Sequence, residues 1–136
     1  MQHLVVQAGL GDQIRVESAG VGAQLGAPAD PRSCATAARN GIELHSRSRS
    51  FHRTDLDDFD YILMMDQQNL AALRMLSESP AHRPKLRLLR DFDPDSPPDA
   101  EVPDPFRGDD GFDRVFALCE AACRGLLLQI RSDHQI

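Results

Sequence analysis

Residues 59–70 of the chain read FDYILMMDQQNL. The apolar and aromatic residues at 61–65 stand together without alternation, which is typical of a short strand covered on both faces. Asp66 follows at once, and a carboxylate at this point can accept hydrogen bonds from the first free N–H groups of a helix. Leucines then recur at helical spacing, at Leu70, Leu73 and Leu76. The segment therefore predicts a buried strand that runs directly into a helix.

Further strand signals stand at residues 14–18 (IRVES) and 85–89 (KLRLL). Strand and helix signals alternate along the chain, which is typical of an α/β domain with a parallel sheet. A length of 136 residues suits one compact domain, and an apolar content of 41% is enough to build a core. We therefore expect residues 1–136 to form a single α/β domain.

Turn and capping residues mark the ends of further helices. Asp30 precedes Pro31 at a first helical position, and Asn40-Gly41 ends that helix. A last helix is predicted for residues 110–130 from its apolar face. Apolar residues at the start of the chain also follow helical spacing, at Met1, Leu4, Val5 and Ala8. Because no capping residue stands before them, we expect the chain to begin inside a helix, with sequence missing upstream.

The net charge of −6 argues against a nucleic-acid scaffold and against a polybasic membrane patch. Basic residues do cluster at 47–53 (RSRSFHR), where a solvated loop is the first interpretation and a surface that faces an anionic ligand is the second. No apolar stretch is long enough to span a bilayer, and the start of the chain does not have the pattern of a signal peptide. A cytoplasmic location is therefore expected.

Three cysteines, Cys34, Cys119 and Cys123, are expected to be free thiols. Cys119 and Cys123 stand at i and i+4 of the predicted last helix, close enough to share a metal ion. No neighbouring cysteine or histidine completes a zinc site at the usual spacing. We therefore expect no metal site and interpret these two residues as buried cysteines on a helix face.

The segment with the most chemical content is VPDPFRGDD, residues 102–110. Two prolines bracket Asp104 and restrict the backbone around its carboxylate, and Phe106 stands beside it. A carboxyl group held next to an aromatic wall suits a general acid that protonates a leaving aryl oxygen. A structural turn is the alternative, because Asp-Pro pairs are common in turns.

Several segments, in this order along the chain, resemble landmarks of the low-molecular-weight protein tyrosine phosphatase family. They are IRVESAG at 14–20, PADPR at 28–32, NGI at 40–42, FDYILMMD at 59–66 with Asn69-Leu70, and Asp104-Pro105-Phe106. The resemblance implies a four-stranded parallel sheet flanked by helices. It also implies hydrolysis of phosphotyrosine proteins or small phosphate monoesters through a cysteinyl-phosphate intermediate, without a metal or an organic cofactor.

The resemblance assigns roles to individual residues of this chain. Asp104 matches the general acid, and Phe106 matches an aromatic residue that lines the substrate cleft. Ser18 matches a serine that supports the phosphate-binding loop, and Asp66 matches a supporting acidic residue after the third strand. Arg107 is expected to contact the substrate, at a position where many members carry a second aromatic residue.

The nucleophile of the family is absent from this sequence. It belongs to a loop of pattern C-x5-R-S/T, which should follow a first, central strand that is also missing here. Two cysteine–arginine pairs, Cys34 with Arg39 and Cys119 with Arg124, form only C-x4-R and lie inside predicted helices. Because helix interiors offer no free N–H groups to a phosphate, neither pair can serve. The chain as given is therefore expected to be inactive.

The missing central strand should leave unpaired backbone groups in the sheet. We therefore expect the chain to be poorly stable alone, or to close the slot by rearrangement or by self-association. Three functional interpretations stay open. They are a phosphatase whose start site is placed too late, a pseudophosphatase or phosphoprotein-binding remnant, and an arsenate reductase of the same fold that uses Cys119 and Cys123.

Overall fold

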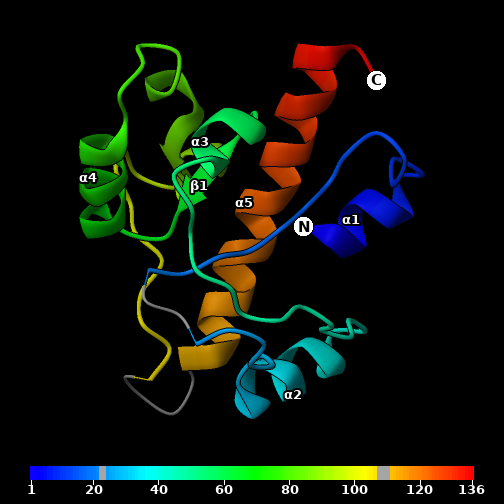
Figure 1. Ribbon diagram of the computed structural model, residues 1–136. Coiled ribbons are helices and arrows are strands. Elements are labelled where there is room, and N and C mark those ends of the chain that lie inside the picture. The colour runs from blue at the N-terminus through cyan, green and yellow to red at the C-terminus, as the bar shows by residue number, and fades with distance from the viewer. Residues whose placement is uncertain (22–23, 107–110) are drawn as a thin grey trace.

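The computed structural model describes residues 1–21, 24–106 and 111–136 of the chain. Its elements are α1 (Gln2–Gln7), α2 (Pro31–Arg39), α3 (Asp55–Asp58), β1 (Ile62–Met64), α4 (Gln67–Leu76), the 3₁₀ turn η1 (Arg83–Lys85), β2 (Leu86–Leu88), the 3₁₀ turn η2 (Leu89–Phe92) and α5 (Gly111–His134). Figure 1 shows α5 running through the centre, with β1, α3 and α4 on one side and α1 and α2 at the opposite side and end. No described helix is long and apolar enough to cross a membrane.

The two predicted strands at 61–65 and 85–89 are confirmed in shorter form as β1 and β2. They pair in parallel, with Ile62 opposite Leu86 and Met64 opposite Leu88. Both faces of β1 are covered, as its unbroken apolar run predicts. Ile62 and Met64 pack in a cluster with α3, α4 and β2, whereas Tyr61 and Leu63 pack against the cluster under α5.

The helix boundaries predicted from capping residues are also confirmed. The Asp30 carboxylate accepts a hydrogen bond from the Arg32 N–H at 2.8 Å, and Asp66 accepts one from the Asn69 N–H at 2.8 Å. Each contact satisfies one of the free donors of a first helical turn. At the start of the chain, α1 forms with no side-chain cap, and its Val5 is fully buried.

The predicted strand at 14–18 is wrong. Within the described part of the chain, this segment joins no strand, and the nearest backbone pairing is a bridge between Gly20 and Ser50. Around it, the Ile14 N–H instead bonds back to the Leu10 carbonyl, and Gly20 exchanges hydrogen bonds with Arg49 and Phe51. A β pattern becomes a strand only where a neighbouring backbone forms a ladder with it, and the described residues form none with residues 15–19. The described sheet accordingly has two strands, whereas the sequence predicted the four-stranded sheet of the family without its central strand.

The last helix continues past the predicted end at residue 130 and packs against η2. Leu89 and Phe92 of η2 are buried against Ala122, Leu126 and Ile130 of α5. The two backbones approach closely where α5 carries Gly125. A Cβ atom at this position would lie 1.8 Å from the Phe92 carbonyl oxygen. Glycine is therefore required here by the contact between the two elements.

A hydrogen bond joins the end of α5 to Tyr61, which is the only tyrosine of the chain and directly precedes β1. The Tyr61 hydroxyl donates to the Asp133 carboxylate at 2.6 Å. Burial of the phenol, together with this carboxylate, raises the pKa of Tyr61 to about 12. The phenol therefore favours the folded state below its ordinary pKa of about 10, and this contribution is lost as the pH rises through about 12.

We expect the ultraviolet absorbance of tyrosinate to appear near pH 12 while the chain stays folded. The chain contains no tryptophan, so this absorbance reports Tyr61 alone. Asp133→Asn should move the midpoint down toward the ordinary value, because the neighbouring negative charge is removed. A midpoint near the ordinary value in the unsubstituted, folded chain would contradict the described contact.

Candidate functional site

The Asp104 carboxylate stands on a loop that is tied to the end of β1. The Val102 N–H donates to the Met65 carbonyl at 2.8 Å, so the loop leaves the sheet beside the carboxyl end of the strand. Asp104 itself is exposed, and its Oδ1 atom accepts a hydrogen bond from the Phe106 N–H at 3.0 Å. This local turn and the flanking prolines fix the backbone around the carboxylate. The carboxyl ends of parallel strands are where α/β proteins place their sites.

Two residues that the sequence did not single out anchor this loop. The Arg90 guanidinium donates to the Glu101 carbonyl at 2.7 Å and to the Ser96 hydroxyl at 3.2 Å. The Glu101 carboxylate accepts a hydrogen bond from the Gln67 N–H, in the first turn of α4, at 2.7 Å. Charge-assisted hydrogen bonds of this kind are stronger than neutral ones. They hold the loop against both η2 and α4.

The structure brings two predicted site residues, Asp66 and Asp104, into one pocket of about 370 Å³. The two carboxylates differ in their roles, because Asp66 caps α4 whereas Asp104 accepts a hydrogen bond within its own turn. The pocket also contains a cation from α5, Arg114, which has no ionic partner among the described residues. Its full lining is Asp66, Gln68, Arg90, Glu101, Val102, Pro103, Asp104 and Arg114.

The Phe106 ring is held by a cation and a second ring. It meets Phe112 of α5 edge to face, with ring centroids 5.6 Å apart. The Arg32 guanidinium lies 4.7 Å from the centroid of each ring. Arg32 is oriented in turn by the Asp30 carboxylate, and this contact lowers the pKa of Asp30. Phe106 nevertheless remains 59% exposed, so it can still present an aromatic face to a ligand.

The loop also rests directly on the first residue of α5. A Cβ atom at Gly111 would lie 2.4 Å from the Pro105 carbonyl oxygen, so a larger residue would push the loop away from the helix. Asp104, Phe106 and Gly111 therefore form one unit, in which a carboxylate and an aromatic ring are presented together by a fixed backbone.

The family described as "Low molecular weight phosphotyrosine protein phosphatase" matches residues 1–136. The chain belongs to this family. A low-molecular-weight protein-tyrosine-phosphatase of Streptomyces coelicolor is 38% identical over 130 residues, which cover 93% of this chain and 79% of that protein. The crystal structure of a protein tyrosine phosphatase from Entamoeba histolytica superposes with a TM-score of 0.88 at 28% identity, covering 98% of this chain and 85% of that one. A Drosophila arginine phosphatase superposes with a TM-score of 0.83 at 29% identity, covering 97% of this chain and 86% of that one.

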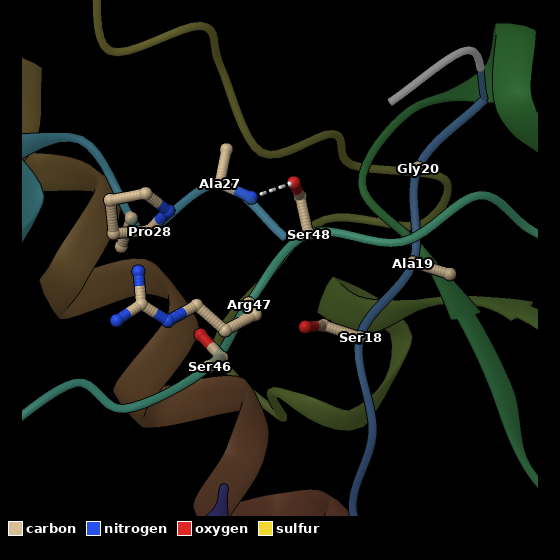
Figure 2. A pocket seen from close by; sticks show the side chains of 9 residues that line it. Ser18, Ala19, Gly20, Ala27, Pro28, Ser46, Arg47 and Ser48 are labelled. Atoms are coloured by element: carbon tan, nitrogen blue, oxygen red, sulfur yellow. Dashed lines mark hydrogen bonds between the residues drawn. The ribbon is translucent and has the colours of Figure 1, made fainter. Parts of the chain in front are cut away.

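The structure does not bring all the predicted site residues together. Ser18 lines a different pocket from Asp104, formed with residues 19–20, 27–29 and 46–48 (Figure 2). Phe106 belongs to the same turn as Asp104, but it is not among the residues that line the pocket of Asp66 and Asp104. Arg107 lies outside the described residues.

The three cysteines all lie in helices of the described residues. Cys34 lies in α2, with its thiol directed to the Ala29 carbonyl at 3.7 Å. Cys119 and Cys123 lie on the inner side of α5, and both are at least half-buried. Burial, together with the neighbouring Cys123, raises the pKa of the Cys119 thiol to about 11, so this group is protonated at neutral pH.

The arginines that follow these cysteines are also engaged elsewhere. Arg39 pairs with Asp113 at 2.7 Å, and Arg124 pairs with Glu120 at 3.5 Å. Neither arginine is therefore directed at a phosphate site near a thiol. Over residues 1–21, 24–106 and 111–136, no group of three or more His, Cys, Asp or Glu side chains is arranged to hold a metal ion.

Proposed function

We propose that this chain carries the general-acid part of a phosphotyrosine phosphatase site, with Asp104 as the acid and Phe106 as a wall for the aryl group. The observation that carries the proposal is the presentation of an exposed carboxylate and an exposed aromatic ring on one fixed loop at the carboxyl end of β1. Membership of the family supports the reaction class.

In the proposed reaction, a cysteine thiolate attacks phosphorus and the bond to the tyrosyl oxygen breaks. Asp104 donates its proton to that leaving oxygen, and the ionised carboxylate then takes a proton from the water that hydrolyses the cysteinyl phosphate. Asp66 supports the site by holding the start of α4, and Ser18 supports the phosphate-binding loop. Arg107 is proposed as a contact to the substrate. No metal or organic cofactor takes part in these steps.

We further propose that these 136 residues alone do not turn over phosphotyrosine, because they contain no C-x5-R segment. In the family fold, that segment follows a central strand, which would pair beside β1. The thiols of the described chain lie in helices, with their arginines paired to carboxylates. The raised pKa of Cys119 also weighs against the arsenate reductase alternative, which requires a reactive thiol pair.

The test compares this chain with a chimera that carries the strand and C-x5-R loop of the Streptomyces relative in front of residue 1. Both proteins are assayed with a phosphotyrosine peptide and with a phosphoarginine peptide, and a Cys→Ser chimera is the matched control. We expect turnover of phosphotyrosine by the chimera and none by the chain or the control. Preference for phosphoarginine would replace the proposed substrate class.

Two other results would overturn parts of the proposal. Phosphotyrosine turnover by the 136-residue chain itself would mean that a nucleophile is present which the C-x5-R argument does not recognise. A folded but inactive chimera would contradict the phosphatase assignment. Tight binding of the phosphotyrosine peptide by the chain, without turnover, would favour the pseudophosphatase alternative.

A further inference from the structure

The segment that carries Asp104 has few backbone donors of its own. Pro103 and Pro105 flank Asp104, and a proline has no backbone N–H group. The prolines restrict the shape of this segment, but they do not determine where it lies relative to the sheet. The position of the Asp104 carboxyl group therefore depends on contacts made by the residues on either side.

The residues just before this segment are held by three different elements. The Val102 N–H donates to the Met65 carbonyl, at the end of β1, at 2.8 Å. The Glu101 carboxylate accepts a hydrogen bond from the Gln67 N–H of α4 at 2.7 Å. The Glu101 carbonyl accepts one from the Arg90 guanidinium of η2, also at 2.7 Å. The loop is thus bound at its start to β1, α4 and η2.

The contact from Arg90 is made by a half-buried side chain on a fixed backbone. Arg90 lies in η2 between Leu89 and Phe92, and both of these residues are buried against α5. Its Nε atom donates to the Ser96 hydroxyl at 3.2 Å, while its Nη1 atom donates to the Glu101 carbonyl. Because a guanidinium group is planar, binding at two of its nitrogens fixes its orientation. Arg90 therefore connects the packed core under α5 to the start of the loop.

Arg90 also differs from other arginines of the chain in its choice of acceptors. Arg39 and Arg53 each bind a carboxylate at 2.7 Å. Arg90 forms no ion pair within the described residues and binds a carbonyl and a hydroxyl group instead. It also lines the pocket that contains Asp66 and Asp104. Its contacts thus join two loop segments at the edge of the candidate site and do not neutralise a charge.

We propose that Arg90 is a positioning residue, which places the Asp104 carboxyl group within reach of the leaving oxygen by holding the Glu101 peptide. This inference rests on the proposed role of Asp104 as the general acid. Proton transfer needs a separation of about 2.6–3.2 Å between the two oxygens. A displacement of about 1 Å can lower a rate on the order of 10²-fold. Without Arg90, the contacts to β1 and α4 keep the loop near the site but allow the carboxyl group a wider range of positions.

The first measurement is amide hydrogen exchange of the 136-residue chain, which does not depend on activity. Arg90→Gln should speed exchange of the Val102 amide about tenfold, because the charge-assisted hydrogen bond to the adjacent peptide is lost. The Asn69 amide, which donates to Asp66 just beyond β1, should exchange as before. Arg90→Lys should recover most of the protection of Val102, because an ammonium group can still donate to the Glu101 carbonyl.

The second measurement uses the chimera that carries a relative's C-x5-R loop. Arg90→Gln should lower kcat for phenyl phosphate on the order of 10–10²-fold, with little change in KM. Turnover of p-nitrophenyl phosphate should stay within about twofold, because its leaving group needs no proton. The matched control is Arg87→Gln. Arg87 lies 4.3 Å from the centroid of the Phe92 ring, so it contacts η2 but makes no described contact with the loop.

The two measurements distinguish failure of this inference from failure of the proposed function. Unchanged exchange of the Val102 amide in Arg90→Gln would overturn the positioning role. Equal losses with both substrates, or equal losses in Arg87→Gln, would also overturn it, because both indicate general damage to the fold. A leaving-group effect in Asp104→Asn but none in Arg90→Gln would exclude Arg90 alone. Absence of the effect in Asp104→Asn itself would overturn the general-acid assignment, whereas faster exchange of Val102 would still show that Arg90 holds the loop.

Discussion

In the chimera with a relative's C-x5-R loop, we expect Asp104→Asn to lower kcat about 10²–10⁴-fold, which is the usual contribution of a general acid. Asparagine keeps the size of the side chain and an oxygen that can accept the Phe106 N–H, so the turn at Asp104 should persist. What is lost is the proton for the leaving oxygen. The loss should therefore appear in kcat, while KM changes little, because the residue acts in the transition state.

Leaving-group dependence separates this chemical role from a structural one. Phenyl phosphate needs its oxygen protonated as the bond breaks, whereas p-nitrophenyl phosphate leaves as a stable anion. The effect of Asp104→Asn should therefore be much larger for phenyl phosphate. Asp93→Asn is the matched control, because Asp93 also precedes a proline and also accepts hydrogen bonds within its own turn. Equal losses with both substrates, or in both variants, would contradict the assignment.

The largest effect on stability is expected from Gly125→Ala in α5. The new Cβ atom would lie 1.8 Å from the Phe92 carbonyl oxygen and 2.8 Å from its carbon. Both are backbone atoms, so neither can move aside by changing a rotamer. Overpacking of this kind costs about 3 kcal/mol, which exceeds the gain of about 1 kcal/mol in helix propensity. We expect the Tm to fall by about 10 °C.

Thermal unfolding followed by circular dichroism measures this change. Gly11→Ala is the control, because no atom lies within 4 Å of the new Cβ and the backbone there does not have a positive φ. Its free energy of unfolding should stay within about 0.5 kcal/mol of the unsubstituted chain. A Gly125→Ala variant with an unchanged Tm would show that η2 and α5 are not in the contact described above.

The parts of the fold that follow from local chemistry were predictable from the sequence. The caps at Asp30 and Asp66 depend on neighbours two or three residues away, and β1 depends on an unbroken apolar run. The segment at 14–18 has a similar local pattern, but it forms no strand because pairing needs a backbone from elsewhere in the chain. Strand formation is therefore a non-local property that a pattern alone cannot decide.

The site divides in the same way. Asp104, between its two prolines, and the nearby Phe106 carry a signal within a few residues, so both could be proposed. Arg90 and Arg32 carry no such signal, because each acts on a loop remote in sequence. An arginine in a sequence can point to solvent, to a carboxylate or to a ring, and only the folded chain decides among them. The anchors of the loop were therefore not predicted.

The arrangement of β1 has a consequence for how the molecule unfolds. Alternate residues along this strand and the Tyr61 that precedes it belong to two different hydrophobic clusters, Ile62 and Met64 to one and Tyr61 and Leu63 to the other. Neither cluster can be exposed to solvent without displacing β1, which also packs in the other cluster. The two halves of the core should thus open as a single cooperative unit rather than in sequence. A three-residue strand couples the α4 side of the molecule to the α5 side, although it contributes little area of its own.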